Sequence, residues 1–168
     1  TPGTPSFTRS YLLAEGGDAL YVAIMGTKQG RDLITDVDLF HAPVWSEAAA
    51  LASDSARLPA AHRGFLARAR ALPVEQLYEI AVARGRRLVL CGHSLGGAVA
   101  KLCTLRLLRE LPEFPPPRVT CCTFATPAVG NAALAELVDD AGWSGYFKSY
   151  QLPEDQLMRL VSIGQLPP

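Results

Sequence analysis

The chain has 168 residues, a length typical of about one domain. Lys and Arg together number 16, as do Asp and Glu, and hydrophobic residues make up 49% of the chain against 19% charged residues. The balanced charge excludes the basic surface of a nucleic-acid-binding protein, and the apolar content excludes a disordered chain. Since no repeat or linker divides residues 1–168, we expect a single domain.

The first predicted elements are two neighbouring strands. Residues Ala19 to Met25 form an apolar run that ends at Gly26, as is typical of a buried strand. Residues Ser10 to Ala14 are predicted to be its hairpin partner, because Gly16-Gly17-Asp18 favours a turn between them.

From residue 74 onward, helices and strands alternate. Apolar residues at helical spacing predict a surface helix that Gly85 ends, with Glu75 and Glu79 turned to solvent; these apolar residues are Val74, Leu77, Tyr78, Ala81 and Val82. The elements predicted after it are a strand at 87–91, a helix at 95–111, a strand at 119–124, a helix at 131–141 and a strand near 146–152. This alternation indicates βαβ units and therefore an α/β fold with a parallel sheet.

A glycine-rich turn, Gly92-His93-Ser94-Leu95-Gly96-Gly97, joins the strand at 87–91 to the following helix. It matches G-x-S-x-G in the strand-to-helix context in which this pattern presents a serine nucleophile. Gly92 and Gly96 relieve crowding at the sharp turn, and Gly97 lets the helix approach the sheet. The sequence therefore predicts that Ser94 attacks a carbonyl group; the alternative is an incidental serine in a glycine-rich turn.

Three further segments, in the right order, make the chain resemble the class 3 (fungal-type) triacylglycerol lipases, especially their plant and algal relatives. Ala23-Ile-Met-Gly-Thr27 resembles the family's oxyanion segment, and His62-Arg-Gly-Phe65 is similar to its His-x-Gly-Phe helix start. Thr123-Phe-Ala-Thr-Pro-Ala-Val-Gly-Asn131 resembles the family's Thr-Phe-Gly-x-Pro-Arg-Val-Gly-Asn strand and turn. The resemblance spans most of residues 19–161. It implies an α/β-hydrolase sheet with helices on both faces, truncated here at its C-terminal side.

An oxyanion hole and a triad acid can be assigned beside Ser94. The hole needs two donors, for which we expect the backbone N–H of Leu95 and, as the resemblance implies, Thr27. The alternative is that Thr27 merely ends a strand. The acid should follow a later strand, and Leu152-Pro-Glu-Asp155 resembles the family's acid segment, so Asp155 is the candidate and Glu154 the second choice.

The general base is missing from this sequence. Its three histidines are His41, His62 and His93, and none follows Asp155, where the family has its base. We expect His93 to point away from Ser94, His62 to pack at a helix start and His41 to lie in a loop. Either the base lies beyond Pro168, or the protein is a lipase-like module without catalysis. We favour the first, because nucleophile, oxyanion residue and acid all remain.

Several features of the sequence do not indicate catalysis. The four cysteines, Cys91, Cys103, Cys121 and Cys122, lie in apolar runs without metal-site spacing, so we expect reduced core thiols. The longest uncharged stretch is interrupted by Pro127 and Gly130, so no membrane span is predicted. No signal peptide is visible at Thr1, which together with the thiols slightly favours an intracellular compartment. We expect the chain to begin inside a longer protein.

Together these features predict a serine carboxylic-ester hydrolase that acts on acylglycerols or phospholipids in lipid metabolism. The alternatives are a non-catalytic interaction module and another serine acyl hydrolase, such as a thioesterase or peptidase. We expect a lipid ester as partner, with transient contact to a membrane surface or lipid droplet, and no nucleic acid. Residues 30–40 form either a lid or a small buried helix. No metal site or nucleotide-binding motif is present in the sequence, so no cofactor is implied.

Overall fold

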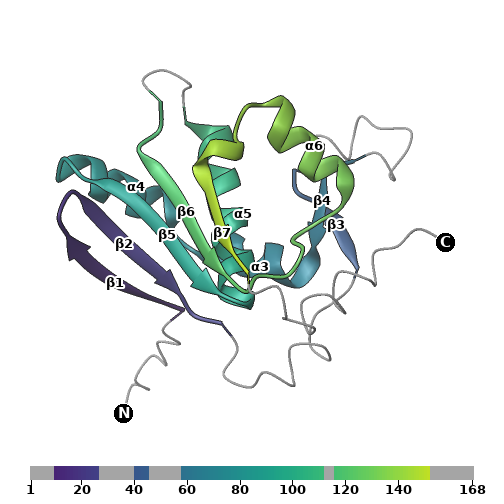
Figure 1. Cartoon of the computed structure of the whole chain (residues 1–168), viewed down its shortest axis with the longest axis horizontal. Coiled ribbons are helices and arrows are strands. Elements are labelled where there is room, and N and C mark those ends of the chain that lie inside the picture. Colours follow the sequence, from purple (N-terminus) through teal and green to yellow (C-terminus); the bar gives the residue numbers. More distant parts are fainter. Residues whose placement is uncertain (1–9, 27–39, 46–57, 112–115, 152–168) are drawn as a thin grey trace, which may run out of the picture.

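The computed structural model describes residues 10–26, 40–45, 58–111 and 116–151. Its elements in chain order are β1 (Tyr11–Gly16), β2 (Ala19–Ile24), β3 (His41–Pro43), β4 (Ala60–His62), α3 (Arg63–Ala71), α4 (Val74–Ala83), β5 (Arg87–His93), α5 (Leu95–Glu110), β6 (Val119–Phe124), α6 (Ala132–Asp140), the 3-10 turn η2 (Ser144–Tyr146) and β7 (Phe147–Tyr150) (Figure 1).

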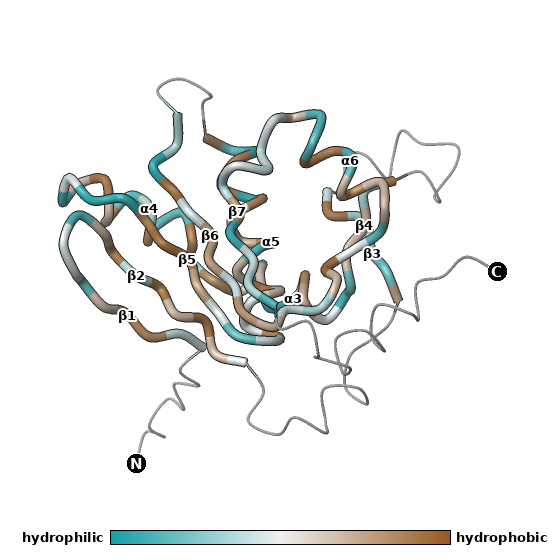
Figure 2. The backbone as a smooth tube through the Cα atoms, viewed as in Figure 1, coloured by the Kyte–Doolittle hydropathy of each residue, from teal (hydrophilic) through white to brown (hydrophobic). Residues whose placement is uncertain are grey.

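The main sheet has the strand order β1-β2-β5-β6-β7. β1 pairs with β2 as an antiparallel hairpin, and the other three pairings are parallel, which confirms the predicted mostly parallel sheet. The central strands β2, β5 and β6 carry the apolar runs, and Figure 2 shows hydrophobic residues concentrated along β2 and β5. Continuous apolar runs are expected where parallel strands lie buried inside a sheet.

The described helices pack on one face of this sheet; the resemblance implied helices on both faces, and within the described residues none covers the second face. Each step from β2 to β5, β6 and β7 moves in the same direction across the sheet. Right-handed crossovers then place all the connecting helices on the same side. Leu88 and Leu90 of β5 share one buried cluster with residues of α3, α4, α5 and α6, and α5 packs against β5 and β6 at its centre.

A second, two-stranded sheet joins β3 and β4, which the sequence did not predict because each strand has only three residues. Its antiparallel register pairs His41 with His62. His62 then precedes the first residue of α3, so the helix start expected from His62-Arg-Gly-Phe65 is confirmed.

The predicted elements from residue 74 onward are all present, with ends that differ by a few residues. In α4, Val82 is 47% exposed although its spacing predicts burial, so that detail is wrong. The Glu75 side chain is 40% exposed, and it also forms an ion pair with Arg106 of α5 that the sequence did not predict. The Arg106 guanidinium also donates to the carbonyls of Ala69, at 2.8 Å, and Leu72, at 2.7 Å. A single side chain thereby joins α3, α4 and α5.

Candidate active site

Ser94 lies at the sharp turn between β5 and α5. Its backbone adopts φ 55° and ψ −124°, a conformation that L-residues rarely occupy. Its amide donates to the Phe124 carbonyl of β6 at 2.9 Å, and its carbonyl accepts from Gly97 at 3.0 Å and Ala98 at 3.2 Å. The side chain makes no capping bond to α5. The hydroxyl is therefore not used by the helix that it precedes.

The three glycines of the turn permit close backbone contacts. A Cβ at Gly92 would overlap the carbonyl group of Gly96, and a Cβ at Gly96 would overlap the Ile24 carbonyl of β2. A Cβ at Gly97 would collide with the Thr126 hydroxyl. These contacts agree with the crowding predicted for this turn, and they bring the ends of β2 and β5 against the start of α5.

The backbone amide of Leu95 begins α5, where the first amides of a helix have no partner within the helix. The end of β2 lies beside it: a Cβ at Gly26 would lie 4.0 Å from the Leu95 nitrogen and 3.6 Å from that of Gly96. Gly26 directly precedes Thr27, the predicted second oxyanion residue, which is outside the described residues. The described neighbourhood thus consists of free helix-terminal amides next to the carboxyl end of β2.

The carboxyl end of β7 lies on the other side of Ser94. Phe124 of β6 stacks on Tyr150 of β7, with ring centroids 5.3 Å apart, and the Tyr150 carbonyl accepts from the Ala125 amide at 2.9 Å. The chain is described as far as Gln151; Glu154 and the predicted acid Asp155 are outside the described residues.

The three histidines lie in two places. His41 and His62 pack together, with ring centroids 4.5 Å apart, and His62 also contacts Phe65 edge-on at 5.3 Å. His62 is only 2% exposed, which agrees with the packing role expected of it, whereas His41 lies in strand β3 rather than in a loop. His93 ends β5 and is exposed. Because side chains alternate along a strand, His93 shares a face with Cys91, opposite the face that α5 covers.

Sequence reasoning missed the role of two residues of the segment 123–131. Ala125 adopts φ 45° although it is not glycine, and it stands where the family pattern has Gly. Asn131 caps α6 by accepting from the Leu134 amide at 3.1 Å, and it also accepts from the Ala60 amide of β4 at 3.0 Å. The family pattern contains Asn131, but only the structure shows what the amide joins.

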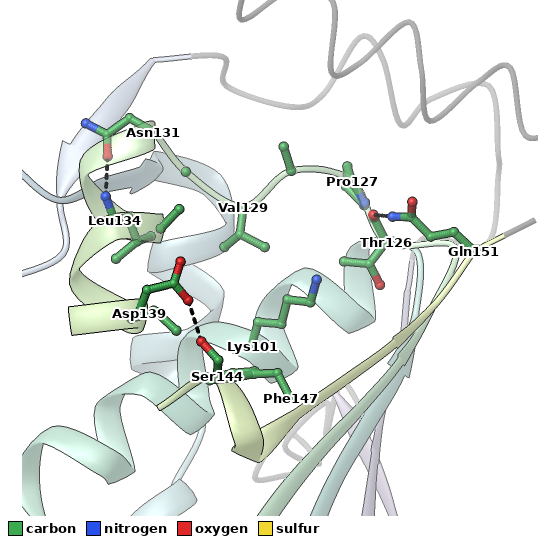
Figure 3. A pocket seen from close by; sticks show the side chains of 14 residues that line it. Lys101, Thr126, Pro127, Val129, Asn131, Leu134, Asp139, Ser144, Phe147 and Gln151 are labelled. Carbon is green, nitrogen blue, oxygen red and sulfur yellow. Dashed lines mark hydrogen bonds between the residues drawn. The ribbon is translucent and has the colours of Figure 1, made fainter. Parts of the chain in front are cut away.

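A third missed feature is a cavity of about 490 Å³ between α5, α6 and β7 (Figure 3). Thr126 lines it and also contacts Gly97, so the cavity begins close behind the nucleophile turn. Lys101, one helical turn after Gly97, extends into it. Lys101 stands between buried residues of α5 such as Val99 and Leu102, and this is the sequence signal that could have indicated the cavity.

No cluster of three His, Cys, Asp or Glu residues that could hold a metal ion is found in the described part of the chain. The four cysteines are all free thiols, Cys103 and Cys121 being buried. Among the residues of known placement, no helix is both long and apolar enough to cross a membrane.

The mostly parallel sheet with a serine at the strand-to-helix turn defines an α/β-hydrolase. Residues 21–161 match the Lipase (class 3) family, and the chain belongs to this family.

Solved lipases have the same fold. The lipase of Rhizopus microsporus var. chinensis superposes with a TM-score of 0.67 at 26% identity, covering 94% of this chain and 50% of that one. Lipase II of Rhizopus niveus gives a TM-score of 0.61 at 25% identity, over 85% of this chain and 51% of that one. The chain thus spans about half the length of the fungal lipases that it matches.

A plant protein is similar in sequence. Protein EDS1B of Arabidopsis thaliana is 34% identical over 86 residues, which are 48% of this chain and 13% of that protein. The matched stretch is therefore a small part of the plant protein.

Proposed function

We propose that this protein is a serine hydrolase of carboxylic esters, with Ser94 as its nucleophile. The Ser94 oxygen attacks the ester carbonyl carbon while its proton passes to a histidine base. The tetrahedral intermediate then collapses, and the alcohol leaves with that proton. Water next adds to the acyl-enzyme, which releases the carboxylic acid and restores the serine.

The backbone of Ser94 is the observation that supports this proposal most. A left-handed conformation costs an L-residue about 1–2 kcal/mol, and it persists only where the surrounding structure enforces it. Here hydrogen bonds to Phe124 and Gly97 hold the turn, while the hydroxyl is left out of the helix cap. A strained turn with an uncommitted hydroxyl is what a nucleophile at a strand-to-helix junction requires.

The other roles follow from chemistry and from the family pattern. We assign the oxyanion hole to the Leu95 amide and to Thr27, which follows the Gly26 that borders this amide. We assign the triad acid to Asp155, four residues after Gln151. The base in this proposal is a histidine that follows residue 168 in the full-length protein.

The substrate class is an acyl ester of a lipid, such as an acylglycerol or phospholipid, met at a membrane surface or lipid droplet. Family membership and the fungal lipase folds support this class. Met25 and Ala128 stand where the family pattern has Arg, and Met158, which is outside the described residues, stands where it has Pro. Met25 follows the last residue of β2, lies directly before Gly26 and is 39% exposed. We propose that these replacements alter acyl-chain or head-group preference rather than the reaction.

The test is covalent labelling of the full-length protein with a fluorophosphonate, followed by peptide mass spectrometry. We expect a single labelled peptide that contains Ser94, and none after Ser94→Ala. Ester, thioester and peptide substrates then separate a lipase from other acyl hydrolases. Because a serine without its base loses orders of magnitude in rate, residues 1–168 alone should hydrolyse short-chain esters very slowly.

A second candidate function is a lipase-like interaction module without catalysis. The placement of the histidines favours it: His41 and His62 pack on each other, and His93 is exposed at the end of β5. Absence of fluorophosphonate labelling in a folded full-length protein would overturn the hydrolase and support this module.

A further inference from the structure

The cavity behind the nucleophile turn has the size and the walls of a ligand pocket. Its volume of about 490 Å³ is within the roughly 300–1,000 Å³ that is typical of small-molecule sites. Val129, Leu134, Val138 and Phe147 supply apolar side chains to its lining. They come from the loop after β6, from α6 and from β7, so the walls are built by elements that the sheet holds in place (Figure 3).

The Lys101 ammonium is the cationic group of this cavity. Figure 3 shows its side chain extending from α5 into the space below Val129. Its chemistry differs from that of the other partly buried cation of α5, Arg106, which bonds to two carbonyls and to Glu75. Within the described residues, Lys101 has neither an ion pair nor a hydrogen bond. Its charge is therefore partly removed from water without the compensation that Arg106 has.

The acidic residue that lines the cavity does not neutralise this charge. Asp139 of α6 accepts a hydrogen bond from the Ser144 hydroxyl at 2.5 Å, and it forms no ion pair with Lys101. Burial lowers the pKa of Lys101, and no carboxylate contributes to that pKa. An ammonium held in such surroundings gains stability from an anion that enters with it.

We propose that this cavity binds a single-chain lipid carboxylate, with its carboxylate on Lys101 and its hydrocarbon chain along the apolar walls. The positive group selects an anion, and the walls of Val129, Leu134 and Phe147 select an aliphatic chain. A lipid carboxylate is also the product class of the proposed ester hydrolysis. The binding of the carboxylate does not need Ser94, so the binding proposal and the proposed function can be overturned independently of each other.

The experiment is isothermal titration calorimetry of the full-length protein with decanoate, below its micelle concentration and at neutral pH. We expect decanoate to bind, and decan-1-ol, which lacks the charge, to bind at least tenfold more weakly. Lys101→Met should weaken the affinity for decanoate at least tenfold, whereas the affinity of Lys101→Arg should stay within about threefold of that of the unaltered protein. Ser94→Ala should bind decanoate unchanged, even though it abolishes fluorophosphonate labelling.

Two further variants localise the site. Lys148 of β7 is exposed and directly follows the cavity residue Phe147, so strand alternation places it on the opposite face. Lys148→Met should therefore leave decanoate binding unchanged. Ala135 lines the cavity from an exposed position of α6. The larger side chain in Ala135→Trp should fill the cavity and abolish decanoate binding.

Any of four results overturns the proposal: no binding of decanoate, equal binding of decan-1-ol, full affinity in folded Lys101→Met, or full affinity in folded Ala135→Trp. Equal binding of the alcohol would mean that the cavity selects only apolar groups. If Lys101→Met proves unfolded by circular dichroism, Ala135→Trp and the comparison of acid with alcohol still decide the question.

Discussion

The side-chain oxygen of Asn131 accepts a hydrogen bond from the Ala60 backbone amide at 3.0 Å, and the backbone amide of Asn131 donates one to the Ala60 carbonyl, also at 3.0 Å. The same side chain donates to the Leu58 carbonyl at 2.7 Å and accepts from the Leu134 amide at 3.1 Å. One carboxamide thus joins β4 to the start of α6. It needs an acceptor and a donor together, which an amide supplies and a carboxylate does not.

Asn131→Ala should therefore reduce the free energy of unfolding by about 3 kcal/mol, since it removes a helix cap and two further hydrogen bonds of partly buried groups. Asn131→Asp keeps the acceptor and loses only the donor to Leu58, so its loss should be about 1 kcal/mol. Urea unfolding followed by circular dichroism measures both. Equal losses of unfolding free energy for the two variants would show that the bond donated to Leu58, and not the cap of α6, accounts for most of the stabilisation.

Substitutions at Ser94 and Ala125, two non-glycine residues with positive φ, distinguish an effect on stability from an effect on activity. Ala125→Gly and Ser94→Gly should each stabilise the fold by about 1 kcal/mol, because glycine adopts their left-handed backbone without strain. Only Ser94→Gly should lose fluorophosphonate labelling. Thermal unfolding measures the first effect, with Ala98→Gly inside α5 as a control that should destabilise by about 1 kcal/mol. Destabilisation by Ala125→Gly would contradict the strain argument.

The contact between β2 and the nucleophile turn can be tested with a pair of glycines. Gly96→Ala places a methyl group on the Ile24 carbonyl, so β2 and α5 must separate, and we expect a loss of about 3 kcal/mol or more in unfolding free energy. Gly145→Ala is the matched control: nothing lies within 4 Å of its Cβ, so its effect should be within about 0.5 kcal/mol. Chemical denaturation of both variants provides the comparison. A Gly96→Ala protein as stable as Gly145→Ala would mean that the two elements are not in contact.

The ion pair between Arg106 and Glu75 should contribute more to stability than the exposed pair between Arg84 and Glu15. The Arg106 side chain is 21% exposed and forms two bonds to Glu75, whereas those of Arg84 and Glu15 are 54% and 39% exposed. Double-mutant cycles with alanine should give a coupling free energy of about 1.5 kcal/mol for the first pair and less than about 0.5 kcal/mol for the second. Similar couplings would show that burial of Arg106 adds nothing.

The buried cysteines predict a loss of stability at alkaline pH. Burial raises the pKa of Cys103 and that of Cys121 to about 12, from an ordinary value of 9.0. The unfolded chain therefore releases these protons first, so the free energy of unfolding falls as pH rises from about 9 towards about 12. Urea midpoints measured at pH 8 and pH 10.5 test this, and Cys121→Ala, with one such thiol fewer, should show a smaller decline. An equal decline would place Cys121 in a solvated environment.

Sequence reasoning located the strands and helices from residue 74 onward because each is long enough for its apolar period to appear. The strand Val119–Phe124 has its predicted bounds, and α5 ends at Glu110, one residue before the predicted end. It failed for β3 and β4, whose three residues each carry no period. It also did not predict that Glu75 pairs with Arg106, since helical spacing says which residues turn away from the core but not which cation of a neighbouring helix lies there.

The alternation of strand and helix patterns, together with the glycine-rich turn at residues 92–97, was sufficient by itself to predict an α/β protein with a serine at a strand-to-helix turn. These are local properties, because hydrophobic period and turn residues act within a few positions of the chain. Only the tertiary structure decided that Asn131 holds Ala60, that the end of β2 borders the Leu95 amide, and that Lys101 extends into a cavity. Those relations join residues from different elements, and packing rather than local sequence determines which groups meet.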